Sequence, residues 1–197
     1  MTDSTGDAPA RRSAETTRAA ILRSARDRFA AHGYERTTIR AVAADAQIDP
    51  SMVMRYFGSK EQLFDAALTV DLHLPDLSAV PPAELPELMV RHFLHRWEHA
   101  PADDALLMLL RSGVTNEKAA ARLHEVFARQ VAPALVAAVG PQAAARAGGV
   151  VAAQLLGVAV TRYLLRLPGV VALEPEQLVA ALAPAIAATL GITPKSG

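Results

Sequence analysis

The chain has 197 residues, 51% of them hydrophobic and 5% aromatic, with no cysteine and a formal net charge of zero at pH 7. This length suits one mid-sized domain or a small domain joined to a larger one, and the apolar fraction is sufficient for a core. The lack of cysteine excludes disulfides, thiolate zinc sites and cysteine nucleophiles. Helix-forming residues are abundant and long β-branched alternations are missing, so we expect an all-α fold.

Only the N-terminal third of the chain carries a net positive charge. Residues 11–70 carry ten Lys/Arg against seven Asp/Glu, residues 1–10 carry −2, and the remainder carries ten positive against eleven negative charges. This is a modest electrostatic footprint for a nucleic acid and is insufficient alone. The polar start with Asp3 and Asp7 does not resemble a signal peptide. The apolar run 147–165 contains Gln154, Thr161 and Arg162, which favours a buried helix over a membrane span and predicts a cytoplasmic protein.

The predicted elements begin with a flexible arm at residues 1–13. Apolar residues recur at helical spacing over residues 15–32, and Gly33 is expected to end that helix. A short helix starts after Thr37 and Thr38, and a turn follows at residues 47–49. The short helix and the turn form the first half of a predicted helix-turn-helix.

Strong capping signals mark the second half of the helix-turn-helix. Asp49 is a good N-cap and Pro50 a good first helical residue, so a helix over residues 50–57 is predicted, with Val53 and Phe57 inward. Gly58 ends it. Ser59 and the glutamine three residues later match a capping box that opens a further helix, expected over residues 59–72.

A proline-rich connector, residues 74–86, separates two predicted domains. The expected organisation is an arm at 1–13, a DNA-binding domain at 14–73, the connector, and a helical domain at 87–191. Helices in the last domain are predicted at residues 87–100, 103–112, 116–139, 142–167 and 175–190.

The short helix 50–57 is the candidate DNA-reading element, because a major groove admits one α-helix whose exposed residues reach base edges. The arginine at position 55 can donate two hydrogen bonds to a guanine, and methionines can touch thymine methyls. Lys60 and the free N–H groups at the start of the next helix favour a phosphate. The side chains predicted to face outward are Ser51, Met52, Met54, Arg55 and Tyr56.

The stretch from Thr37-Thr38-Ile39-Arg40 through Tyr56-Phe57-Gly58-Ser59-Lys60-Glu61 resembles the TetR-family signature. The resemblance covers about residues 16–68. It implies an all-helical homodimer with N-terminal DNA-binding heads, each a three-helix unit, and a C-terminal ligand-binding and dimerisation domain. The positions it implies for DNA contact are Thr38, Arg40, Ser51, Met52, Arg55, Tyr56 and Lys60. Two residues depart from the family pattern: Gln47 stands where glycine is usual, and Met54 where an aromatic residue is usual. A helical hairpin within a core is the alternative interpretation.

The C-terminal region is less informative. Gly148, Gly149 and Gly157 allow helices to approach closely, which together with the helix 175–190 suggests a four-helix dimer bundle; a monomeric core is the alternative. A small apolar or amphipathic effector is expected to bind in a cavity among the helices of residues 88–139, closed by the helix 142–167. Its candidate contacts are His92, Phe93, Trp97, Met108, Arg111 and Phe127, each of which is equally compatible with an ordinary core or surface position.

No cofactor or metal is expected. His92, His95 and His99 share a helical face, but His92 and His99 are about 10.5 Å apart along the axis at the rise of an α-helix, too far for one ion. A histidine pair with Asp103 or Asp104 remains as an alternative. No phosphate loop or nucleophile motif is present, so the prediction is a regulator rather than an enzyme. The sequence therefore predicts a repressor that binds double-stranded operator DNA and is released by a small effector; a helical enzyme and an interaction scaffold are the rival classes.

Overall fold

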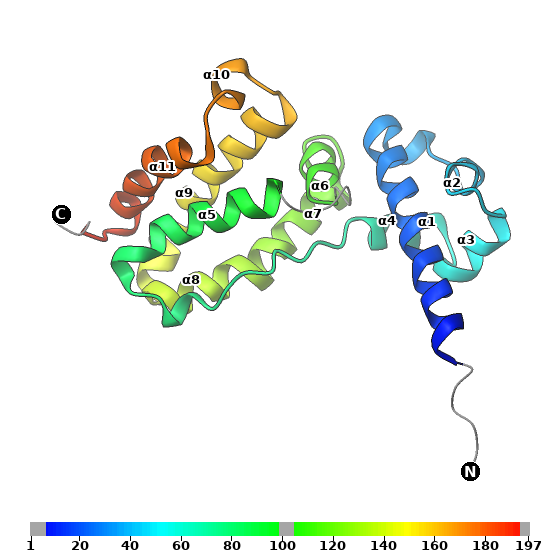
Figure 1. Cartoon of the computed structure of the whole chain (residues 1–197), viewed down its shortest axis with the longest axis horizontal. Coiled ribbons are helices and arrows are strands. Elements are labelled where there is room, and N and C mark those ends of the chain that lie inside the picture. The colour runs from blue at the N-terminus through cyan, green and yellow to red at the C-terminus, as the bar shows by residue number, and fades with distance from the viewer. Residues whose placement is uncertain (1–6, 99–104, 194–197) are drawn as a thin grey trace, which may run out of the picture. The chain divides into compact units, whose positions relative to one another are not determined.

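The computed structural model describes residues 7–98 and 105–193, and within these ranges every regular element is a helix (Figure 1). The all-α fold predicted from the sequence is confirmed. The chain divides into two compact units. Unit 1 comprises Met1–Val70 and Pro101–Ala120, and unit 2 comprises Asp71–Ala100 and Ala121–Gly197. The helix at 105–113, which lies within the predicted helical domain 87–191, is grouped with the N-terminal helices in unit 1.

Unit 1 is built on a long first helix. Helix α1 (Asp7–Arg36) begins well before residue 15, where the sequence predicts a helix to start. The prediction of a flexible arm at residues 1–13 is therefore wrong for residues 7–13. Residues 1–6 lie outside the described part of the chain. Pro9 falls in the first turn of α1, where a missing N–H costs nothing. The other helices of the unit are α2 (Ile39–Asp45), α3 (Pro50–Phe57), α4 (Lys60–Ala67) and α6 (Ala105–Gly113).

The core of unit 1 is formed mainly by α1 and α4, with α6 packed on α1. Phe64 of α4 lies edge-on to Phe29 of α1, with ring centroids 4.8 Å apart. Arg26 of α1 is buried and its Nε donates to the Ala67 carbonyl at 3.0 Å, which satisfies the end of α4. This scaffold holds the two short helices α2 and α3, which are too small to form a core by themselves.

Helix α4 is shorter than predicted, and this corrects the expectation of a helix over 59–72. It ends at Ala67, and Leu68 and Val70 stay buried in a non-helical segment. The next segment of the chain, around Leu72, is held within unit 2 by hydrogen bonds to side chains. Gln130 accepts from the Leu72 N–H at 2.8 Å, and His92 Nε2 lies 3.0 Å from the Leu72 carbonyl. The connector then forms two short 3-10 turns, Leu77–Ala79 and Pro82–Glu84.

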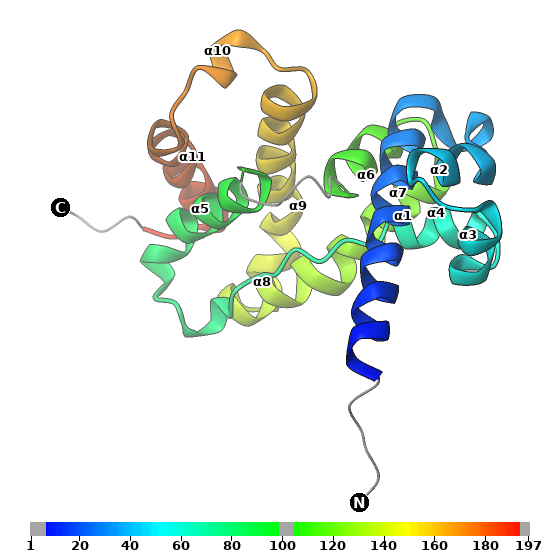
Figure 2. The same cartoon turned by 45° about the vertical axis from the view of Figure 1, so that its right-hand side comes forward.

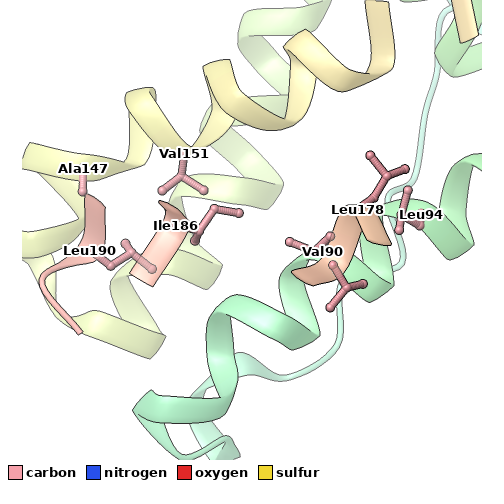
Figure 3. Close-up of a cluster of buried hydrophobic side chains, with 8 residues drawn as sticks. Val90, Leu94, Ala147, Val151, Leu178, Ile186 and Leu190 are labelled. Carbon is pink, nitrogen blue, oxygen red and sulfur yellow. The ribbon is translucent and has the colours of Figure 1, made fainter. Parts of the chain in front are cut away.

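Unit 2 contains α5 (Leu85–Glu98), most of α7 (Glu117–Val126), α8 (Ala132–Val139), α9 (Pro141–Val158), α10 (Pro168–Val171) and α11 (Pro175–Leu190). Helices α5 and α11 lie side by side, and α9 packs on α11 and α8 (Figure 2). Buried side chains of α5, α9 and α11 meet in one apolar cluster (Figure 3). Its members are Val90, Leu94, Ala147, Val151, Leu178, Val179, Ile186 and Leu190.

Two π-helical turns interrupt the long helices that the sequence predicts. Residues Phe127–Val131 join α7 to α8, and residues Ala159–Leu164 extend α9. In the first, the Ala132 N–H reaches back five residues to Phe127, directly before Pro133, which has no N–H to continue an α-helical ladder. In the second, Arg162 contacts Glu98 at 3.0 Å and donates to the carbonyls of Val170 and Leu173, which anchors the short, unpredicted helix α10.

Candidate nucleic-acid interface

Local capping fixes the helix-turn-helix. The Thr38 hydroxyl accepts from the Ala41 N–H at 3.2 Å and caps α2, while Asp49 accepts from the Ser51 N–H at 2.8 Å and caps α3. The hydrogen bonds from the Ser51 side chain and backbone lower the pKa of Asp49, so the cap stays charged at neutral pH. Gln47 in the turn has a φ of 56°, the left-handed conformation for which glycine is usual. A side chain there costs about 1 kcal/mol, and the turn keeps its geometry nonetheless.

Helix α3 presents one buried and one open face. Val53 and Phe57 are buried against the scaffold, as the sequence predicts. Ser51, Met54 and Arg55 are exposed, and Met52 and Tyr56 are half-buried. The Arg55 guanidinium lies 5.5 Å from the centre of the Tyr56 ring, a cation–π contact that leaves its N–H groups available. The open face therefore carries the side chains proposed for base contact.

The turn between α3 and α4 requires glycine. Gly58 has a φ of 75°, and a Cβ there would lie 2.2 Å from Gln62 Oε1. The Ser59 hydroxyl then accepts from the Gln62 N–H at 3.1 Å and opens α4. Tight caps on both sides of this turn hold α3 at a fixed angle to α4.

Lys60 is engaged inside unit 1. Its ammonium donates to the Glu35 carbonyl at 3.3 Å and lies 4.3 Å from the centre of the Tyr34 ring. Thr38 and Arg40 at the start of α2 are exposed. The nearby Arg28 is paired with Asp45. The hydrogen bond from Arg28 lowers the pKa of the Asp45 carboxyl. The cations of this unit thus differ in whether their charge is already neutralised.

The six residues predicted to contact an effector do not gather in one unit. Met108 and Arg111 lie on α6 of unit 1, where Met108 is buried in the core and Arg111 is exposed. His92, Phe93, Trp97 and Phe127 lie in unit 2 and are half-buried.

Trp97 belongs to an aromatic cluster that the sequence did not predict. Its ring stacks on Tyr163 at 5.0 Å with an interplanar angle of 2°, and Phe93 lies 6.0 Å away. Burial, and then the Glu98 carboxylate, raise the pKa of Tyr163 to about 12, and its hydroxyl donates to Glu98 at 3.1 Å. Tyr163 follows Trp97 by 66 residues in the sequence, so no local pattern could pair the two.

A pocket of about 390 Å³ lies on unit 2 between the connector and α8. Its lining residues are Asp71, Leu74, Pro75, Asp76, Leu77, Gln130, Ala134 and Ala137, none of which was predicted. The prediction of six effector contacts is therefore not tested by this pocket, which uses other residues.

The histidine cluster forms no metal site in the part of the chain that is described. His92 is engaged with the Leu72 carbonyl, and no group of three potential ligands occurs within residues 7–98 and 105–193. His99, Asp103 and Asp104, which belong to the alternatives, lie outside these residues.

Comparison with known proteins gives two family matches. Residues 83–190 match the family described as Tetracyclin repressor-like, C-terminal domain, and residues 21–67 match Bacterial regulatory proteins, tetR family. The first match alone spans more than half of the 197 residues. The chain belongs to the TetR family.

Similar proteins agree with this assignment. The HTH-type transcriptional repressor Rv3405c of Mycobacterium tuberculosis and an HTH-type transcriptional regulator of Mycobacterium bovis are each 44% identical over 54 residues, which is 27% of this chain and 29% of theirs. The matched region thus spans less than a third of the curated relatives. Solved structures extend the likeness in fold to most of the chain.

A TetR-family regulator from Streptomyces coelicolor A3 is 24% identical, with a TM-score of 0.50 over 89% of this chain and 94% of its own. HlyIIR, a Hemolysin II transcriptional regulator, is 18% identical, with a TM-score of 0.52 over 86% of this chain and 98% of its own. A linker-substituted HlyIIR mutant is 16% identical, with a TM-score of 0.60 over 86% and 97%. At these identities the structures support the TetR fold alone.

The TetR-family chain also carries an open apolar face on unit 2. Small and apolar residues are exposed along one side of α9 and one side of α11, with the i, i+4 spacing of a helix face. They are Ala145, Gly149, Val150, Ala153, Leu156 and Gly157 on α9, and Ala180, Ala181, Pro184, Ala185 and Ala188 on α11. We call this set the α9–α11 face.

The prediction that residues 147–165 form a buried helix does not hold for the single chain. The helical stretch Pro141–Leu164 is long and apolar enough to cross a membrane by length and composition alone, a test that core helices of soluble proteins also pass. Only 22% of its most apolar window is buried. The expected buried side of α9 exists, but much of the helix is left without a partner in one subunit.

The three glycines of α9 that were expected to allow close helix approach have two kinds of surroundings. A Cβ on Gly148 would lie 3.1 Å from Leu135 Cδ1, so this glycine serves packing of α9 on α8 within the subunit. A Cβ on Gly149 or Gly157 would meet nothing within 4 Å. Only the latter two are free to lie at an interface with another chain.

Proposed function

We propose that this TetR-family chain is a cytoplasmic, sequence-specific DNA-binding repressor that acts as a homodimer on a double-stranded operator. The observation that carries the proposal is the open face of α3. Ser51, Met54 and Arg55 project from a short helix whose angle is fixed by caps at Asp49 and Ser59. Thr38, Arg40, Met52, Tyr56 and Lys60 complete the proposed DNA-contacting set.

The α9–α11 face supports the homodimer. Large apolar faces on soluble proteins usually mark an interaction surface, and two helices from each of two subunits form a four-helix bundle. Two DNA-binding heads then address two half-sites about one helical turn apart. Selection of bound fragments from random DNA tests the proposal: enrichment of a palindromic sequence is expected, whereas retention without any sequence enrichment would contradict it.

We expect Arg55→Ala to weaken operator binding by about 1–3 kcal/mol and to relax base preference at one position of each half-site. The reason is that the guanidinium lies on the open face of α3 and can bridge two acceptors of one guanine. Affinity for the operator and for variants with one changed base pair is measured by fluorescence anisotropy. Arg23→Ala, an exposed arginine of α1, is the control. An equal loss on all sequences would contradict a base contact.

The proposed effector is a small apolar or amphipathic molecule that binds unit 2, with His92, Phe93, Trp97 and Phe127 as candidate contacts there. Helix α4 stops at Ala67, so no single helix over residues 59–72 links the DNA-binding helices to unit 2. The segment directly after unit 1 is instead held by unit 2, where His92 and Gln130 bond the Leu72 backbone and Arg96 donates to the Asp71 carbonyl at 3.2 Å. A ligand that shifts α5 would act on this segment.

We expect an inducing compound to quench Trp97, the sole tryptophan, and to bind more weakly to the operator-bound dimer. Linkage requires operator DNA to weaken the ligand by the same factor by which the ligand weakens DNA. Hydrophobic compounds are titrated against the free and the operator-bound protein, and quenching is followed. A compound with equal affinity for both states does not regulate binding and would contradict the coupling for that compound.

A further inference from the structure

Arg18, on the first helix, is held beside the recognition helix. Its guanidinium carbon lies 5.3 Å from the centre of the Phe57 ring. Phe57 is the last residue of α3, and it lies three residues before the start of α4. Phe57 is only 7% exposed, whereas Arg18 itself remains exposed. The charge of a residue from α1 is thereby placed at the turn between α3 and α4.

Two guanidiniums are held on aromatic rings that neighbour each other in sequence at this end of α3. Arg18 stacks on Phe57 and Arg55 stacks on Tyr56, its neighbour in sequence. Stacking on an aromatic ring restricts an arginine while leaving the N–H groups at its edge free to donate. Such an arrangement reduces the entropy lost when an acceptor is bound.

Three other cations of unit 1 already have oxygen partners. Lys60 donates to the Glu35 carbonyl, Arg28 pairs with Asp45, and Lys118 pairs with Glu61 at 3.2 Å. Arg18 has no ion pair with any carboxylate in the part of the chain whose side chains are described. Its positive charge is therefore unneutralised beside a surface that faces DNA in the proposed function.

We propose that Arg18 binds a DNA backbone phosphate next to the base contacts of α3, as an additional DNA-binding residue supplied by α1. The inference rests on the proposed function. A phosphate fits better than a base, because the guanidinium lies at the end of α3 and is fixed over a ring rather than extended from the open face. Phosphate contacts set the position of a protein on the duplex and carry no sequence information.

The test is the salt dependence of operator binding in Arg18→Gln, which keeps most of the side-chain length but removes the charge. Each phosphate contact contributes about 0.9 to the slope of log affinity against log salt concentration. We expect the slope to fall by about one unit, with equal loss on operator and non-operator DNA. Arg18→Lys should restore most of the slope, and Arg23→Gln, five residues further along α1, should leave it unchanged.

A purely structural role for Arg18 gives a different result. If its contact with Phe57 only fastens α1 to α3, Arg18→Gln lowers the midpoint of thermal unfolding and leaves the salt slope unchanged, which would overturn the inference. Lys60→Ala, measured alongside, shows whether the ammonium held by Glu35 and Tyr34 also contributes to the slope. Failure of the wild-type protein to bind any DNA selectively would instead reject the proposed function, so the two failures are distinguishable.

Discussion

Gly157→Leu is expected to leave the subunit folded but to convert the dimer into a monomer. Gly157 is exposed, and a Cβ there would meet nothing within 4 Å in the single chain. A leucine is therefore accommodated by the isolated subunit. In the proposed four-helix interface the same position opposes a second subunit, where added side-chain volume forces the helices apart.

Loss of the dimer has a large effect on operator binding because two linked heads bind far more tightly than one. Linking two binding events raises the overall affinity by about 10²–10⁴-fold, and that gain disappears when the subunits separate. Sedimentation velocity at micromolar concentration gives the assembly state, and anisotropy on an operator with both half-sites gives the affinity. The circular dichroism spectrum is expected to stay that of the wild type.

Two control substitutions make this test specific. Gly148→Leu places a side chain against Leu135 within the subunit and is expected to destabilise folding rather than assembly. Ala31→Leu adds the same side chain at an exposed position of α1, in the other unit, and is expected to change neither. A Gly157→Leu protein that remains dimeric with full operator affinity would show that the α9–α11 face is not the interface.

The helix-turn-helix was predictable because its signals are local. Asp49 with Pro50, Gly58 and Ser59 specify where α3 begins and ends and where α4 begins, and each forms the expected cap or turn. Short-range hydrogen bonds fix these features, so a single sequence contains them. The conformation of Gln47 was not predicted: the sequence shows only that it stands where glycine is usual, and the structure places it in the left-handed region.

The end of α4 was missed, and the packing of α6 on α1 was not predicted, because both depend on tertiary contacts. Leu68 and Val70 are buried although they are not helical, so the apolar spacing continues past the last helical residue and hides the boundary. In the sequence, the whole of α5 lies between α6 and the other helices of unit 1, yet α6 packs on α1. Hydrophobic periodicity shows that a face is buried but not which element buries it.

The same ambiguity explains α9. Its apolar residues predict burial, and the sequence cannot distinguish burial within one chain from burial against a second copy. The structure separates the two: Ala147, Gly148 and Val151 face the subunit core, whereas Gly149 and Gly157 do not. The candidate base contacts on α3 come from local pattern, while the roles of Arg18 and Tyr163 required the fold.

Phe64→Ala is expected to destabilise unit 1 by about 3–5 kcal/mol, the usual cost of truncating a buried phenylalanine. Phe64 is 1% exposed and contacts Phe29 edge-on and Tyr34 with ring centroids 4.9 Å apart. Alanine leaves a cavity between α1 and α4 and removes two aromatic contacts. Since α2 and α3 have no core of their own, their position depends on this junction.

Urea unfolding followed by circular dichroism measures the loss, and operator affinity is measured on the same samples below the unfolding transition. Met54→Ala is the matched control, because Met54 is 45% exposed on α3 and a surface substitution changes stability by about 0.5 kcal/mol or less. The control is expected to alter operator preference without moving the transition, whereas Phe64→Ala moves the transition and lowers DNA binding only as far as the head unfolds. A stability loss below about 1 kcal/mol for Phe64→Ala, far under the usual range for a core phenylalanine, would mean that the α1–α4 junction does not hold the DNA-binding head together.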